Sequence, residues 1–267
     1  NQTEVLTAIK PEQTHGVAIS PLVPADRARL MSLLAAETKV VTFDNDAPRS
    51  TRICYIGTNN WTAGQLAADL IREALPDGGK IAIFVGDHER DNAIHRRQAM
   101  LAALEGLRPN VGPEYPDLAS PVTIGSFEVI GTYLDGNSEE KAEENAAKAL
   151  EDHDDLSALV ALYGYNGPAC LRALKTADKL GAVKIIAFDE HDATLQGIAD
   201  GHVFGTVVQQ PYSYGYESVR LLADFNRRPD SSSTYGGSGT FFLPCEIVKP
   251  DNLEDFKAEL AARLRNK

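Results

Sequence analysis

The feature that most constrains this 267-residue chain is an apolar run that ends abruptly in acids. Residues 40–48 have the sequence VVTFDNDAP, so a β-branched run is followed directly by Asp44, Asn45 and Asp46. Short runs of this kind are typical of a strand buried on both faces of a parallel sheet. Ligands of open α/β sheets bind just beyond the carboxyl ends of such strands. The sequence therefore predicts that these three polar residues lie where a ligand binds.

Two later strands repeat the design. The run at 184–188 (KIIAF) ends in Asp189, and the run at 204–208 (FGTVV) ends in Gln209 and Gln210. A carboxylate accepts hydrogen bonds from two neighbouring hydroxyls, and an amide offers both an acceptor and donors. Arg96, one turn into an expected helix, would donate a two-pronged hydrogen bond. Such a set suits a neutral polyol such as a sugar.

The C–H face of a sugar needs aromatic surface, which Phe43, Trp61, Tyr163 or Tyr165 would supply. A competing interpretation is that the strand-end Asp and Asn residues are ordinary turn or capping residues, for which these types are favoured.

Helical and strand patterns alternate along the chain, which is typical of an α/β fold with parallel sheets. Helices are expected at 1–10, 25–38, 61–75, 92–107, 138–152, 166–180, 193–200, 211–227 and 252–265. Strands are expected at 16–21, 40–43, 52–57, 80–86, 127–133, 158–163, 184–188, from 203 and within 240–249. Asn166 is predicted to cap its helix, and Tyr212, Tyr214 and Tyr216 to lie on a helix surface. Residues 109–121 are predicted to form a turn-rich insertion and 229–239 a flexible connector.

Charge and composition exclude several classes of partner. The formal net charge of −12 and the pI near 5.0 argue against nucleic acid or an anionic membrane surface. No apolar run approaches the ~18–20 residues that span a bilayer. Cys54, Cys170 and Cys245 show neither metal nor disulfide spacing and are predicted to be ordinary buried thiols. The six histidines show no metal spacing either, so no metal and no cofactor are predicted.

One enzymatic alternative remains open. An apolar strand ending in D-x-D, as at Asp44 and Asp46, begins phosphotransferases of the haloacid-dehalogenase type, in which the first Asp is a nucleophile and Mg²⁺ is held between carboxylates. The Gly-Thr that follows in that family is missing, as is a convincing acidic pair downstream. Nucleotide-binding glycine motifs and a G-x-S-x-G elbow are also absent. A Mg²⁺-dependent phosphatase is therefore a minor alternative.

A set of stretches in a fixed order resembles the type I periplasmic sugar-binding proteins, the ribose-binding and LacI-like group. These stretches are GVAISPLVP, VVTFDNDAP, YIGTNNWTAGQLAADLI, NAIHRRQAMLAAL, YNGPACLRAL, KIIAFDEHDATLQGIADGHVFGTVVQQPYSYGYESV and FFLPCEIVKPDN. They cover nearly the whole chain, and the ordered set is more specific than any single piece.

The resemblance marks nine positions as candidate ligand contacts. They are Asp44, Asn45, Arg96, Asp189 and Gln209, then Tyr163 or Asn166, with Ser20 and Asn137 near other contact positions. The chain departs from the family pattern around Arg96, where His95 replaces a Glu and Ala99-Met100 replaces Gly-Phe.

The resemblance also implies two Rossmann-like lobes joined by three crossover strands. One lobe would comprise 1–58 with 210–242, and the other 59–209 with 243–267. The implied function is non-catalytic: a monomer captures a monosaccharide by hinge closure and delivers it to an ABC-type permease. The implied location is the periplasm, with a signal peptide removed.

Family members open with a strand, a helix and a second strand, roughly 40–50 residues, before the point at which this chain starts. We therefore expect a fragment or a resected first lobe. The effector domain of a LacI-type transcription regulator shares the fold and is the principal alternative, although the acidic charge disfavours it. A signal peptide or a helix-turn-helix encoded upstream would decide between these two functions.

Overall fold

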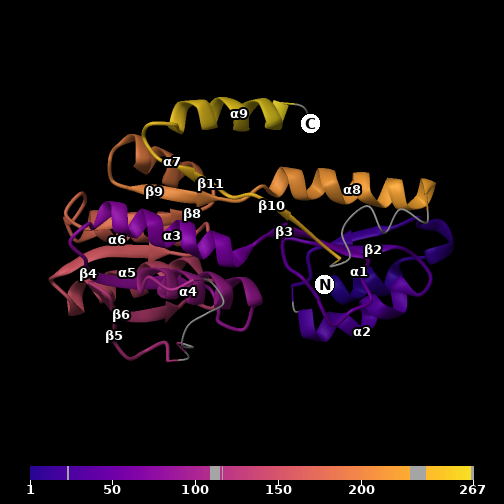
Figure 1. Cartoon of the computed structure of the whole chain (residues 1–267), viewed down its shortest axis with the longest axis horizontal. Helices are drawn as coiled ribbons and strands as arrows, with labels where there is room; N and C mark the ends of the chain where they lie inside the picture. The colour runs from indigo at the N-terminus through magenta and orange to yellow at the C-terminus, as the bar shows by residue number, and fades with distance from the viewer. Residues whose placement is uncertain (23, 109–114, 116, 229–238, 266–267) are drawn as a thin grey trace. The chain divides into compact units, whose positions relative to one another are not determined.

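The chain folds into two compact units in the computed structural model, which describes residues 1–22, 24–108, 115, 117–228 and 239–265 (Figure 1). Unit 1 comprises Asn1–Asn59 and Gln210–Pro244, and unit 2 comprises Asn60–Gln209 and Cys245–Lys267. The chain therefore passes from one unit to the other three times.

Unit 1 is built on a parallel sheet with the strand order β1-β2-β3-β10. Its strands are β1 (Val17–Ile19), β2 (Val40–Phe43), β3 (Cys54–Thr58) and β10 (Thr240–Leu243). Its helices are α1 (Gln2–Ala8), the 3-10 turn η1 (Pro11–Gln13), α2 (Pro24–Ala35) and α8 (Pro211–Arg227).

Neighbouring residues of β2 show how the sheet of unit 1 is covered. Val41 belongs to a core cluster with Leu221 and Phe225 of α8, whereas Val40 belongs to a second cluster with Leu6 of α1 and Met31 of α2. Successive side chains of a strand point to opposite faces, so α8 covers one face and α1 with α2 the other. A β-branched run buried on both faces is what the sequence at 40–43 predicts.

Unit 2 contains a seven-stranded sheet with the order β11-β9-β8-β7-β4-β6-β5. Its strands are β4 (Gly79–Val85), β5 (Val122–Ile124), β6 (Phe127–Leu134), β7 (Leu156–Ala161), β8 (Lys184–Phe188), β9 (Gly205–Val208) and β11 (Glu246–Val248). The inner pairs are parallel, and the edge strands β5 and β11 pair antiparallel with β6 and β9.

Helices pack on both faces of this sheet. They are α3 (Asn60–Ala74), α4 (Asp91–Leu104), α5 (Glu139–Asp152), α6 (Asn166–Thr176), α7 (Asp192–Ala199) and α9 (Leu253–Arg265). Ile81 and Ile83 of β4 join a core cluster with residues of α3 and α4, whereas Ala82 and Phe84 join one with residues of α5 and α6. The carboxyl ends of five parallel strands therefore meet at one edge of a sheet that is buried on both faces.

The predicted α/β fold with parallel sheets is confirmed, with corrections of detail. The expected strand within 240–249 is two strands, because Pro244 separates β10 from β11. Tyr214 does not lie on the surface of α8, since it is only 2% exposed and its hydroxyl hydrogen-bonds with the Thr58 hydroxyl. Asn166 is the first residue of α6 rather than its cap, a position taken by Tyr165.

Two predicted segments lie largely outside the described residues. Residues 109–114 and 116 of the predicted insertion at 109–121 are not described, nor are residues 229–238 of the predicted connector at 229–239. The prediction of three buried thiols is wrong for Cys245, which is partly exposed. Within the described ranges, no helix has both the length and the apolarity needed to cross a membrane.

Candidate functional site

In unit 1, three predicted site residues form one hydrogen-bonded group at the carboxyl ends of β1 and β2. Ser20 Oγ donates to Asp44 Oδ2 (3.1 Å), and Asn45 Nδ2 donates to Asp44 Oδ2 (2.9 Å) and to Ser20 Oγ (3.2 Å). The main chain of this turn is held by Tyr55, whose hydroxyl donates to the Asp44 carbonyl oxygen at 2.7 Å. All three side chains are partly exposed, so this group presents a carboxylate, a hydroxyl and an amide at the surface of the unit.

Asp46 is used differently from Asp44. Its carboxylate pairs with Arg52, whose Nε and Nη2 donate to Oδ1 and Oδ2. The carboxylate also accepts from the Thr42 hydroxyl at 2.7 Å and from the backbone N–H of Ala47. A bidentate Arg–carboxylate pair holds both oxygens in a fixed plane. Asp46 is thereby a structural residue of the turn, which removes the second acid that a D-x-D phosphatase would need.

In unit 2, the centre of the polar network is Arg96 of α4, which is only 2% exposed. Its Nε donates to Asn60 Oδ1 (2.8 Å), its Nη1 to the carbonyl oxygen of Leu162 (2.9 Å) and its Nη2 to Gln209 Oε1 (2.8 Å). The guanidinium also lies over the Phe188 ring, 4.8 Å from the ring centroid. Three nitrogens paired with neutral acceptors and one cation–π contact fix this side chain in place.

The same network reaches Asp189, which directly follows β8. Gln209 Nε2 donates to Asp189 Oδ1 (2.8 Å), while Thr206 Oγ1 donates to the Asp189 carbonyl oxygen (2.8 Å). Asp189 Oδ2 accepts no hydrogen bond from any residue in the described part of the chain. A Cβ added at Gly164 would lie 3.2 Å from that oxygen, so the glycine leaves room beside it. Asp189 thus has one oxygen held by the protein and one available to a ligand hydroxyl.

A second polar group surrounds Asp135, which follows β6 and is 4% exposed. Its Oδ1 accepts from the Tyr165 hydroxyl (2.5 Å) and from the backbone N–H of Asn137 (2.8 Å), and its Oδ2 accepts from Asn166 Nδ2 (2.7 Å). Burial, followed by the hydrogen bond to Asp135, raises the pKa of Tyr165 well above its usual range. The phenol therefore stays protonated and keeps donating. Asp135 positions two candidate residues, Asn137 and Asn166.

Tyr163 lies where the two polar groups of unit 2 meet. Its hydroxyl donates to Asn92 Oδ1 (3.2 Å), and burial, with a further contribution from Asp87, raises its pKa to about 12. A Cβ at Gly86 would lie 2.7 Å from Tyr163 Cε2 and 2.5 Å from Asn137 Oδ1, so both side chains converge on that glycine. Asn137 is exposed and also donates to Asp87 Oδ2 at 3.2 Å.

Trp61 is stacked on His95, with ring centroids 5.0 Å apart and an interplanar angle of 27°. Burial lowers the pKa of His95, although Asp91 partly offsets this effect. His95 is therefore neutral and serves as a flat partner for the indole. Of the other aromatic candidates, Tyr163 and Tyr165 meet edge to face at 6.1 Å.

The structure thus brings the nine candidate residues together as two sets. Ser20, Asp44 and Asn45 form the set on unit 1, and Arg96, Gln209 and Asp189 with Tyr163, Asn166 and Asn137 form the set on unit 2. Sequence reasoning missed Asn60, Asp87, Asn92 and Asp135. For Asp87 and Asp135 a signal existed, because each stands within two residues of the end of a strand, as Asp44 and Asp189 do.

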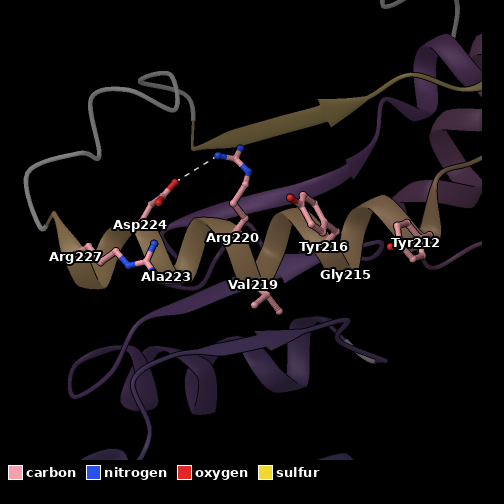
Figure 2. A pocket seen from close by; sticks show the side chains of 8 residues that line it. All are labelled: Tyr212, Gly215, Tyr216, Val219, Arg220, Ala223, Asp224 and Arg227. Carbon is pink, nitrogen blue, oxygen red and sulfur yellow. Dashed lines mark hydrogen bonds and ion pairs between the residues drawn. The ribbon is translucent and has the colours of Figure 1, made fainter. Parts of the chain in front are cut away.

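A surface groove of about 560 Å³ lies elsewhere, on α8 of unit 1 (Figure 2). It is lined by Tyr212, Gly215, Tyr216, Val219, Arg220, Ala223, Asp224 and Arg227. The lining is largely apolar, and its polar contacts include an ion pair between Arg220 and Asp224 at 3.4 Å. None of the candidate residues lines this groove, and its composition does not suit a polyol.

Curated relatives of similar sequence carry sugar-binding names. The chain is 25% identical over 167 residues to a xylose/arabinose-binding protein of Sulfolobus acidocaldarius, covering 61% of this chain and 37% of that protein. It is 25% identical over 176 residues to a ribose import binding protein of Haemophilus influenzae, covering 66% and 53%. A D-ribose/D-allose-binding protein of Pseudomonas aeruginosa is 24% identical, covering 73% and 58%. The chain therefore spans about half the length of these relatives.

Solved structures of similar fold include an ABC transporter solute-binding protein of Burkholderia graminis in complex with D-arabinose. It has a TM-score of 0.80 at 25% identity, covering 94% of this chain and 81% of that one. An arabinose-binding protein of Geobacillus stearothermophilus has a TM-score of 0.77 at 23% identity, covering 96% and 83%.

A family model also matches most of the chain. Residues 3–226 match the family described as periplasmic binding protein domain. Those residues include every candidate position named above and most of both units. This chain therefore belongs to the periplasmic binding protein domain family.

Proposed function

We propose that the chain is the ligand-capturing part of a solute-binding protein that takes up a monosaccharide. One set of candidate residues on each unit would engage the ligand, and closure about the three chain passages would hold it. The closed form would deliver the sugar to an ABC-type permease outside the cytoplasm, without catalysis. The solute-binding protein of Burkholderia graminis, described as part of an ABC transporter, supports this partner, and the description of the family as a periplasmic binding protein domain supports this location.

The observation that carries the proposal is the state of Asp189. One of its oxygens is held by Gln209, and Gln209 is in turn held by the buried guanidinium of Arg96. The Gln209 amide thus links the positive charge of Arg96 to the negative charge of Asp189 within the protein. A neutral ligand fits such a site because it brings no further charge that would need a partner. The acceptor-rich surface at Asp44 and Asn45 suits the hydroxyl donors of the same kind of ligand.

A thermal-shift screen tests the proposal directly. D-ribose, D-xylose, L-arabinose and D-galactose would be compared with amino acids and with a phosphate monoester in Mg²⁺. A sugar present at a hundred times its Kd stabilises the folded state by about 2.7 kcal/mol, so the cognate sugar should raise the melting temperature clearly. A set of monosaccharides without effect, or turnover of the ester, would contradict the proposal.

Asp189→Ala should abolish binding of the stabilising sugar while leaving the fold intact, because the side chain is partly exposed and lies outside the cores. Losing the charge-assisted hydrogen bond that Oδ2 would accept from the ligand costs about tenfold to a hundredfold in Kd, and leaving Gln209 Nε2 without its acceptor adds to the loss. Calorimetry would measure the combined effect. Asp192→Ala is the matched control, since it removes an equal charge from an exposed position three residues later. Equal affinities in both variants would show that the site is misassigned.

A further inference from the structure

Two of the three passages of the chain between the units are flanked by side chains that hydrogen-bond to the same arginine. The passages occur at Asn59–Asn60 and Gln209–Gln210, so Asn60 and Gln209 are the unit 2 residues at these points. They are far apart in sequence, and each accepts a hydrogen bond of 2.8 Å from Arg96: Asn60 from Nε and Gln209 from Nη2.

Arg96 is held too firmly to follow either partner. It is 2% exposed, its Nη1 donates to the Leu162 carbonyl oxygen, and its guanidinium packs on Phe188. Its helix is also close to α3, because a Cβ at Gly64 would lie only 2.3 Å from the Arg96 carbonyl oxygen. Movement of either passage therefore breaks a buried hydrogen bond to a charged donor, which is a costly event.

Arg96 also decides which way the Gln209 amide faces. Because Oε1 accepts from the guanidinium, the amide nitrogen is turned to Asp189 Oδ1 at 2.8 Å. The opposite orientation would place two donors together and leave the carboxylate facing an oxygen. The chain of hydrogen bonds runs from Asn60 through Arg96 and Gln209 to Asp189 without interruption.

We propose that Arg96 is a positioning residue that ties two chain passages to the Asp189 carboxylate, with Asn60 as its anchor. The position of the passages and the orientation of the ligand-facing acid are then coupled. In this role Arg96 acts through its neighbours, in addition to any contact that it makes with the ligand. The link to ligand affinity rests on the proposed function, whereas the coupling of the passages does not.

Hydrogen exchange in the absence of sugar tests the coupling. Asn60→Leu removes the acceptor at similar size, Asn60→Asp keeps an acceptor, and Arg96→Lys keeps the charge but loses the planar fork. Exchange of a peptide spanning residues 205–211 should become about fivefold faster or more in Asn60→Leu and Arg96→Lys, as expected for one lost hydrogen bond. Asn60→Asp should exchange like the parent chain.

The neighbouring Arg97 offers a matched control. It is also buried, at 1% exposed, but it donates to Thr132 Oγ1 and to the carbonyl oxygens of Tyr115 and Asp117. Arg97→Lys should lower stability without changing exchange at residues 205–211. If Asn60→Leu fails to fold, Asn60→Ala replaces it as the variant that withdraws the acceptor.

Two outcomes overturn the inference. One is unchanged exchange at 205–211 in Asn60→Leu and Arg96→Lys, and the other is an equal effect of Arg97→Lys. Calorimetry with D-ribose, D-xylose, L-arabinose and D-galactose forms a separate arm, in which the two variants should lose about fivefold or more in affinity. If no sugar binds but the exchange pattern holds, the proposed function fails and the positioning role stands.

Discussion

At the scale of single residues, the backbone itself singles out the candidate positions. Among the described residues, four that are not glycine have positive φ: Asp44 (60°), Asn137 (67°), Asp178 (56°) and Asp189 (64°). Three of the four are candidate ligand residues. Such a conformation costs about 1–3 kcal/mol and concentrates at functional sites, and Asp and Asn tolerate it best. In both units a Phe at the end of a strand is followed by such an Asp, so each unit aims a carboxylate by the same device.

Glu190, next to Asp189, gives a prediction about pH. Burial and, to a lesser extent, the Asp189 charge raise the pKa of Glu190. The folded protein then binds a proton that the unfolded chain has already lost, so this group lowers stability as the pH rises from the ordinary Glu value of about 4.3. Glu190→Gln should therefore unfold at a higher urea concentration than the parent at about pH 7, with the difference shrinking towards about pH 4.

The control for this prediction is Glu151→Gln, at an exposed position near the end of α5. It should show no comparable dependence of the unfolding midpoint on pH. A Glu190→Gln midpoint that is below that of the parent at neutral pH would contradict the sign of the effect.

At the scale of secondary structure elements, the contact between α3 and α4 sets the position of Arg96. Gly64 permits this contact, because a Cβ there would meet the Arg96 carbonyl oxygen at 2.3 Å and Ala99 Cβ at 2.8 Å. The helices thus approach more closely than any side chain at this position would allow. The close packing that Gly64 of α3 permits therefore sets where α4 places Arg96.

Two helical glycines provide a paired test of that view. Gly64→Ala should destabilise the protein by about 1–3 kcal/mol through overpacking. Gly215→Ala on α8 should stabilise it by about 0.5–1 kcal/mol, because nothing lies within 4 Å of the new methyl group and alanine is the better helix former. Urea denaturation of both variants measures the difference. Stabilisation by Gly64→Ala would show that the helices separate at little cost.

At the scale of the whole molecule, the two units differ in the size of their cores. Counting only the residues that the structure describes, the clusters of unit 1 contain seven and six buried residues, whereas those of unit 2 contain 23 and 22. Since apolar burial is the main stabilising term, unit 1 should be the less stable of the two. A sugar that binds only when both units are folded would raise the stability of unit 1 towards that of unit 2.

The single tryptophan makes this testable, because Trp61 lies in unit 2. Without sugar, circular dichroism should detect unfolding at a lower urea concentration than Trp61 fluorescence does, since only the former reports unit 1. With the sugar that gives the largest thermal shift, the two curves should coincide. Coincident curves in the absence of sugar would contradict the unequal stability of the units.

The alternation of helices and strands, the α/β class and the placement of Asp44 and Asp189 at strand ends can all be predicted from the sequence alone. These features follow from local patterns, because the period of apolar residues reports which face of an element is buried. Other features depend on which strands and helices become neighbours. Arg96 meets partners 36 and 113 residues away only once α3, α4 and β9 are assembled.

The tertiary structure likewise pairs Asp46 with Arg52, whereas Asp44 accepts from Ser20 and Asn45, and it buries Tyr214 beside Thr58. In each case the residue type and its local pattern allow both roles. The choice between the two roles depends on which side chain of a distant segment lies next to the residue. Hydrogen bonding and desolvation depend on these neighbours in space, and a local sequence pattern does not record them.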